Sequence, residues 1–229
     1  MALQHFTREM EGLKKRFLLL FAMVEESLQK SMQAFLDRDA TAAEQVAVDD
    51  KRVDVAEVGV EEECLKILAL HQPIAQDLRY VVSILKINRD LERIGDQAAA
   101  IARITIGICD RASPDVPELR PLMEHTVGML KRAFDSIINL DVEMARRVWN
   151  EDDQADQLTQ EALQRIETQM TRQPAAIGAL LPIYSLVFIL ERIGDHAANI
   201  AKDVLYTVLG EIVRHRGRDF KRPAAPTAG

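Results

Sequence analysis

The hexapeptide Leu-Glu-Arg-Ile-Gly-Asp occurs at residues 190–195 and again, 99 positions earlier, at residues 91–96. The identity extends for six more residues with two differences, one of which is Gln97 against His196. A repeat of this length indicates two equivalent structural units. In each copy the Glu and the Asp are four residues apart, a spacing that places both carboxylates on one face of a helix, one turn apart.

A second pair of acids with the same spacing precedes each hexapeptide, Asp50/Asp54 in the first half and Asp152/Asp156 in the second. A Gln-Pro dipeptide lies midway between the two pairs of each half. Proline lacks a backbone donor and disfavours helix at the residue before it, so each Gln-Pro predicts a turn between two helices. An antiparallel hairpin folded at this turn would bring four acids to the same level in each half.

Four carboxylates at one level repel one another, and this repulsion is the basis for predicting metal sites. Two unit charges about 4 Å apart cost roughly 4 kcal/mol at an effective dielectric constant of ~20. Oxygen-only ligands suit hard ions, so we expect Mg²⁺, Mn²⁺, Ca²⁺ or Fe³⁺. The predicted metal ligands are Asp50, Asp54, Glu92, Asp96, Asp152, Asp156, Glu191 and Asp195. The alternative is that these acids lie on solvated helix faces, in a chain with 36 acidic residues among 229.

The hydrophobic pattern predicts an all-α protein of six helices, because apolar residues recur at three- and four-residue intervals and no stretch alternates as a strand would. Asp39 and Asp141 are the expected N-caps of the second and fifth helices. The predicted helices cover residues 7–36, 40–72, 118–140 and 142–171, and a third helix starts at Ile74 or Asp77 and ends near residue 109. The last helix runs from the second Gln-Pro turn to about residue 214.

Two tandem, pseudo-repeated three-helix bundles follow from this order, the first at residues 1–112 and the second at residues 113–215. A segment with serine and two prolines supplies the boundary. Residues 216–229 form a basic tail rich in proline and alanine, which we expect to be disordered.

Charge and cysteine content narrow the function classes. A net charge of −7 argues against nucleic acid as a partner. Cys64 and Cys109 have no metal-type spacing and are expected to be free core thiols in a reducing compartment.

The first residues lack the pattern of a signal peptide, so a cytoplasmic location is expected. Residues 174–190 carry no charge, yet they are too few to span a membrane and predict a buried helix.

No motif of an enzyme is present. The five histidines form no His-x-x-x-His or His-Glu-x-x-His pair, which excludes a zinc hydrolase of that type. A di-iron oxidase on a helical bundle uses Glu-x-x-His, but Gly95 and Gly194 stand where the histidines would be. His196 adjoins Asp195 but points away from the acidic face, so we expect it to pack or to support a ligand rather than to bind metal.

The order, number and spacing of these motifs resemble the PhoU family of bacterial phosphate-signalling proteins over nearly the whole chain. That family has two tandem three-helix bundles, each with an Asp/Glu-x-x-x-Asp motif on its second helix and Glu-Arg-Ile-Gly-Asp on its third. The resemblance implies that the eight acids named above are metal-cluster ligands. Its Asp-His-Ala-x-Asn-Ile-Ala run is intact at residues 195–201, whereas residues 96–102 depart from it.

The resemblance implies a cytoplasmic negative regulator of phosphate uptake and of the phosphate-starvation response, and not an enzyme. Its implied partners are the ATPase subunit of the phosphate ABC transporter and a membrane-bound sensor histidine kinase, so that contact with the membrane is only through partners. Such a bundle is expected to self-associate as a homodimer. Two alternatives from other classes are a metal-free helical adaptor and a metal-dependent phosphoesterase, the latter using paired ions.

Overall fold

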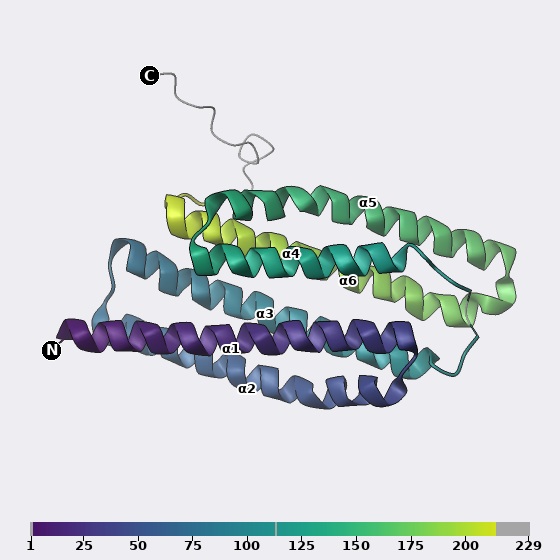
Figure 1. The fold of residues 1–229 in the computed structure, drawn as a ribbon, viewed down its shortest axis with the longest axis horizontal. Helices are drawn as coiled ribbons and strands as arrows, with labels where there is room; N and C mark the ends of the chain where they lie inside the picture. The colour runs from purple at the N-terminus through teal and green to yellow at the C-terminus, as the bar shows by residue number, and fades with distance from the viewer. Residues whose placement is uncertain (1, 113, 214–229) are drawn as a thin grey trace, which may run out of the picture.

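The computed structural model describes residues 2–112 and 114–213, and all regular structure within them is helical (Figure 1). This confirms the predicted all-α fold with its six long helices. The elements in chain order are α1 (Ala2–Asp37), α2 (Ala40–His71), α3 (Ala75–Ile108), α4 (Leu119–Asn139), α5 (Val142–Arg172), a short 3-10 helix η1 (Pro174–Ala176) and α6 (Ile177–Leu209). The predicted tail at residues 216–229 lies outside the described residues.

The helix ends follow the expected cap chemistry. Asp39 and Asp141 have extended backbones, and their carboxylates accept hydrogen bonds from the amides of Ala42 at 2.9 Å and Met144 at 3.0 Å. The first Gln-Pro turn ends α2 with Gln72 in a left-handed conformation. Each cap satisfies a backbone donor or acceptor that the helix itself leaves unpaired.

Two predicted helix ends were wrong. The first helix starts at Ala2 rather than near residue 7. The last helix ends at Leu209 rather than near residue 214, because Gly210 takes a φ of 74° and its amide bonds to the carbonyl of Tyr206 at 2.9 Å. A left-handed glycine of this kind is a common stop for a helix.

The two bundles lie side by side, with α1–α3 forming one layer and α4–α6 the other (Figure 1). Their contact is made mainly by α3 against α6, with a smaller contact of α1 against α4. The rings of Phe21 and Phe134 stack in that smaller contact, with centroids 3.4 Å apart. Buried side chains of all six helices form one continuous hydrophobic cluster. The two repeats therefore share a core.

Helices α3 and α6 run antiparallel, and polar contacts join the first half of α3 to the second half of α6. Ser83 accepts a hydrogen bond from Thr207 at 2.7 Å, and Lys86 contacts Asp203 at 3.3 Å. Arg79 donates to the last-turn carbonyl of Thr207 at 3.2 Å. The buried hydroxyls and the buried carboxylate of Asp203 are thus paired across the junction, as buried polar groups require.

Helix α6 contains the uncharged stretch noted in the sequence. Together with η1 it is the one helical segment in the described part of the chain that is long and apolar enough to cross a membrane by length and composition. One face of it is buried in the bundle, including Leu180, Ile183 and Leu186, whereas Leu181 is 56% exposed. Core helices of soluble bundles commonly pass the same test.

Both cysteines are free. Cys64 is fully buried, and this burial raises the pKa of its thiol to about 12. Cys109 is partly exposed at the end of α3. The expectation of unpaired thiols is confirmed, although only Cys64 lies within the core.

Candidate metal centres

The structure brings the four predicted acids of the first half, here called the first tetrad, together between α2 and α3. Asp50 and Asp54 lie one turn apart on α2, and Glu92 and Asp96 lie one turn apart on the facing side of α3. The helices approach closely at this level because Gly95 has no side chain. A Cβ atom there would lie 3.0 Å from Cγ1 of Val53. The glycine therefore serves the contact between helices.

The pKa shifts show that the acids of the first tetrad act on one another. Partial burial raises the pKa of Asp50, and the charges of Asp54 and Asp96 raise it further. Partial burial also raises the pKa of Glu92, with further contributions from Asp96 and Asp54. Each carboxylate thus loses hydration and faces like charges, which disfavours its ionised form.

One atom of this tetrad lacks any partner. Oδ1 of Asp50 is buried and makes no hydrogen bond. Leaving a buried acceptor unsatisfied is costly, and most such atoms in folded proteins are paired with protein, water or an ion. This unpaired oxygen of Asp50 lies among other carboxylates, and a cation is the ligand that such a group of negatively charged oxygens favours. The residues present therefore fit a hard metal ion.

The second predicted tetrad is brought together between α5 and α6 in the same way. Partial burial raises the pKa of Glu191, and Asp195, Asp156 and Asp152 raise it further. Desolvation raises the pKa of Asp195, again with a contribution from Asp156. Gly194 is less constrained than its counterpart, since the nearest atoms to a Cβ there would be the Cβ of Ala155 at 3.6 Å and the Sδ of Met129 at 4.0 Å.

Basic side chains offset only part of this negative charge. Arg93 approaches Glu92 at 3.4 Å and Asp96 at 3.2 Å, but its own side chain is half exposed. Exposed ion pairs of this kind are worth little. In the second half, Arg192 lowers the pKa of Glu191 and Lys202 lowers that of Asp195, yet both acids remain shifted upward. Each centre keeps an excess of negative charge.

The tetrads are open rather than closed cages. Asp54, Asp156 and Asp195 are exposed to solvent. Among the described residues, no three carboxylates of a tetrad bring ligand oxygens within 4.8 Å of one another. Several acids would have to turn inward to share one ion, and their exposure leaves them free to do so.

Sequence reasoning missed a fifth acid at the first centre. Partial burial raises the pKa of Glu57, and the charges of Glu61, Glu92 and Asp54 raise it further. The amide of Asn88 donates to the Glu57 carboxylate at 2.7 Å and holds it in place. Glu57 also lines an open pocket of about 380 Å³ with Asp54 and Glu92. The available signal was its position one turn after Asp54.

The second half has no equivalent of this pair. The repeat places Thr159 opposite Glu57 and Val187 opposite Asn88. Both residues are buried, and the hydroxyl of Thr159 has no hydrogen-bond partner. The two centres therefore share four acids in register but differ in their surroundings.

His196 faces the other repeat. Its Nδ1 lies 2.8 Å from Oδ1 of Asp90, which directly precedes the first hexapeptide. In the first half the position of His196 is occupied by Gln97. The histidine thus links the helix that carries one centre to the helix that carries the other.

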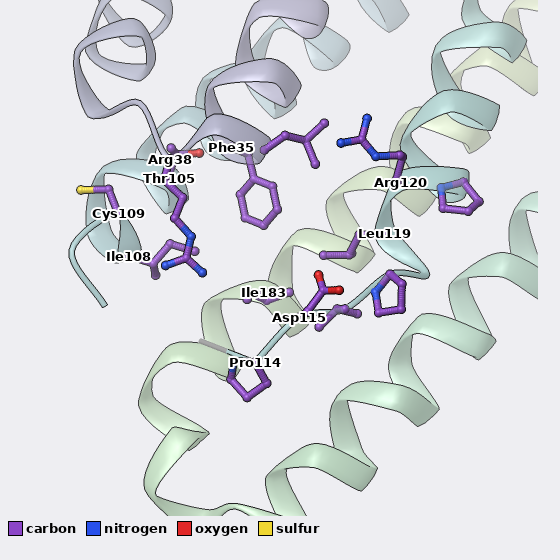
Figure 2. Close-up of a pocket in the computed structure, with 14 residues that line it drawn as sticks. Phe35, Arg38, Thr105, Ile108, Cys109, Pro114, Asp115, Leu119, Arg120 and Ile183 are labelled. Atoms are coloured by element: carbon purple, nitrogen blue, oxygen red, sulfur yellow. The ribbon is translucent and has the colours of Figure 1, made fainter. Parts of the chain in front are cut away.

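A separate cavity of about 540 Å³ lies where the interdomain linker crosses the end of the bundles. Figure 2 shows Arg38, Asp115 and Arg120 at its rim, with apolar side chains such as Phe35 and Ile183 between them. None of the eight predicted ligands lines it. The cavity is therefore distinct from both carboxylate centres.

Comparison with known proteins gives matches over both repeats. The family model described as the PhoU domain matches residues 17–105 and 119–204. A Pseudomonas aeruginosa protein named as a PhoU homolog of the phosphate-specific transport system accessory proteins is 38% identical over 93% of this chain and 89% of its own length. The Escherichia coli accessory protein PhoU is 33% identical over 93% of this chain and 89% of its own length.

Solved structures agree with these matches. The crystal structure of PhoU from Pseudomonas aeruginosa has a TM-score of 0.87 and 36% identity, and the match covers 90% of this chain and all of that one. The phosphate transport system regulatory protein PhoU from Streptococcus pneumoniae has a TM-score of 0.85 and 28% identity, over 91% of this chain and 99% of that one. The match thus extends from sequence to the arrangement of the helices.

Proposed function

Because the chain belongs to the PhoU family, we propose that it is a cytoplasmic accessory protein of phosphate transport that regulates uptake and does so with metal ions bound at its two carboxylate centres. The names of its relatives support the transport role. The role is one of binding rather than catalysis, since relatives are named as accessory or regulatory proteins. The chemical environment of the centres supports the metal.

The observation that carries the metal proposal is the buried, unpaired Oδ1 of Asp50 among Asp54, Glu92 and Asp96. A bound cation supplies positive charge that offsets the repulsion among these acids and satisfies the orphaned oxygen. The four acids of each centre, with Glu57 at the first, would hold Mg²⁺, Mn²⁺ or iron. Because each centre joins two helices of one hairpin, ion binding would fix the second and third helices of a repeat against each other.

We further propose that the protein links the phosphate ABC transporter, through its ATPase subunit, to a sensor histidine kinase and restrains the kinase when phosphate is plentiful. A homodimer is the expected assembly. The exposed acidic centres on the hairpins offer surfaces whose charge depends on bound metal, and such charge sets partner choice and association rate. The kinase link rests on the family resemblance.

The test combines metal analysis with function. The variant Asp54→Ala/Asp156→Ala removes one acid from each centre, and Glu62→Ala/Glu161→Ala removes matched exposed charges from the same two helices. Elemental analysis should find bound metal in the wild type and in the control, and melting curves should show that chelator lowers the stability of both proteins. In Asp54→Ala/Asp156→Ala, the metal content and the effect of chelator should both be smaller. A metal-free wild type whose melting is unchanged by chelator and by added ions would exclude the centres.

Function is tested in an Escherichia coli strain that lacks its own relative. Expression of the wild type and of the control variant should restore repression of a phosphate-starvation reporter and normal phosphate uptake, whereas Asp54→Ala/Asp156→Ala should restore neither. Equal complementation by all three proteins would leave a metal-free adaptor as the function. Size-exclusion chromatography with light scattering on the same samples measures the oligomeric state.

A further inference from the structure

A second kind of metal-ligand cluster lies at one end of the first bundle, and it contains none of the eight acids of the carboxylate centres. His5 and Glu9 are one turn apart near the start of α1, and His71 is the last residue of α2. The start of α1 and the connection after α2 lie at the same end of the molecule (Figure 1). The hairpin of α1 and α2 thus brings together side chains that are 62 or more positions apart.

The ligand atoms of these three residues are already close. Nε2 of His71 lies 2.6 Å from Oε2 of Glu9, and Nδ1 of His5 lies 3.4 Å from Oε1 of Glu9. One ligand atom from each residue lies within 4.8 Å of the other two, and this is the one such group of three among the described residues. Ligands about 2.0–2.1 Å from a tetrahedral zinc ion are separated by roughly 3.3 Å. The cluster needs little movement to reach that geometry.

The surroundings hold the cluster in place. Glu9 is 8% exposed, which is unusual for a carboxylate and requires partners. The ring of His71 packs against the rings of His5 and Phe6, with centroid distances of 5.6 Å and 5.4 Å. His5 is exposed, so the cluster is open to solvent on one side. An ion and a fourth ligand can therefore reach the buried carboxylate of Glu9 and the packed ring of His71 from the solvent side, where His5 lies.

We propose that His5, Glu9 and His71 bind a zinc ion that fastens the first turns of α1 to the end of α2, with water or a partner's side chain as fourth ligand. Two imidazoles and one carboxylate are a common ligand set for zinc with an open position. This donor set differs from the oxygen-only centres, which favour harder ions. The site is independent of the function proposed above.

Lys66 is the competitor for this site. Its ammonium lies 2.9 Å from Oε1 of Glu9 and 3.3 Å from Oε1 of Glu63. An entering zinc ion would displace the ammonium from Glu9, and Glu63 is already in place to keep it. Removal of the lysine should therefore strengthen zinc binding, an effect that a purely structural role of these residues would not produce.

The test uses the full-length protein, stripped of metal and purified without a histidine tag. Competition with a fluorescent zinc chelator measures zinc affinity in the wild type, His5→Ala, His71→Ala and Lys66→Ala. The matched control is His125→Ala, which removes a partly buried imidazole that bonds to the carbonyl of Glu151 at 3.0 Å and belongs to no ligand cluster. A second control, Asp54→Ala/Asp156→Ala, shows whether zinc bound at the acidic centres contributes to the measured affinity.

We expect one zinc site that weakens at least tenfold in His5→Ala and His71→Ala, tightens severalfold in Lys66→Ala, and is unchanged in both controls. Cobalt substitution should give the visible absorption of a four-coordinate ion, lost in His5→Ala. Because His5 is exposed, His5→Ala should keep the wild-type circular dichroism spectrum. Wild-type zinc affinity in His5→Ala, or affinity lost equally in His125→Ala, would overturn the proposal.

Discussion

At the scale of single residues, the two glycines of the repeated hexapeptide have different roles despite identical sequence context. A Cβ at Gly95 would lie 3.0 Å from Cγ1 of Val53, whereas one at Gly194 would make an ordinary contact of 3.6 Å with Ala155. Val53 is buried and β-branched, so it has little freedom to move aside. The first hairpin is therefore packed more tightly at the level of its acids.

Alanine substitution at the two glycines should separate these roles. Alanine is favoured over glycine in a helix by about 1 kcal/mol, so Gly194→Ala should raise the free energy of unfolding by up to that amount. At Gly95 the same gain is opposed by overpacking, which typically costs ~1–3 kcal/mol. Urea denaturation should thus place Gly95→Ala at least ~1 kcal/mol below Gly194→Ala. Equal free energies of unfolding in the two variants would show that the Val53 side chain moves aside without loss of stability.

At the scale of elements, the helix caps repeat as faithfully as the acidic motifs. Asp39 and Asp141 cap the second helix of each repeat through the same amide three residues later. Replacing Asp141 with Ala leaves that amide without its partner and should lower the free energy of unfolding by about 1 kcal/mol. Asp141→Asn keeps an acceptor and should lie close to the wild type in the same denaturation experiment. Equal losses in both variants would assign the effect to charge rather than to the cap.

At the scale of the whole molecule, the two acidic centres should make stability depend on pH when metal is removed. Asp50, Glu57, Glu92, Glu191 and Asp195 all have raised pKa values in the folded protein. Between about pH 4 and these raised values the folded state binds more protons than the unfolded state. The stability that protonation provides is present at lower pH and is lost as pH rises through the folded pKa values.

In chelator, the melting temperature should therefore be higher near pH 5 than at pH 7.5, and saturating Mg²⁺ or Mn²⁺ should flatten or reverse this trend. Circular dichroism melts across this range measure it. Glu191→Gln has no proton to gain and should show a weaker pH dependence than the wild type. A melting temperature that rises with pH in chelator would contradict the predicted sign.

The repeat made much of the fold predictable. Helix order, both caps and the register of the two tetrads followed from local spacing and from the Gln-Pro turns, because each depends on residues of a single hairpin. The bundle-to-bundle contacts of Asp90 with His196 did not follow, since hydrophobic period does not say which helix faces meet. The cluster of His5, Glu9 and His71 was missed for a similar reason. Its histidines are 66 positions apart and meet only when α1 docks on α2.

The junction of α3 and α6 joins equivalent surfaces of the two repeats. These helices are the equivalent third helices of the two repeats, and they meet antiparallel through Ser83 with Thr207 and Lys86 with Asp203. At the opposite end, Ile108 and Ile183 line the same cavity. By the 99-residue offset of the repeat, Ile108 is the equivalent of Thr207, and Ile183 directly follows the equivalent of Ser83. Contacts between equivalent surfaces are those of a symmetric dimer. The single chain therefore buries, between its own two halves, the face that a protein of one repeat would leave open to a second copy.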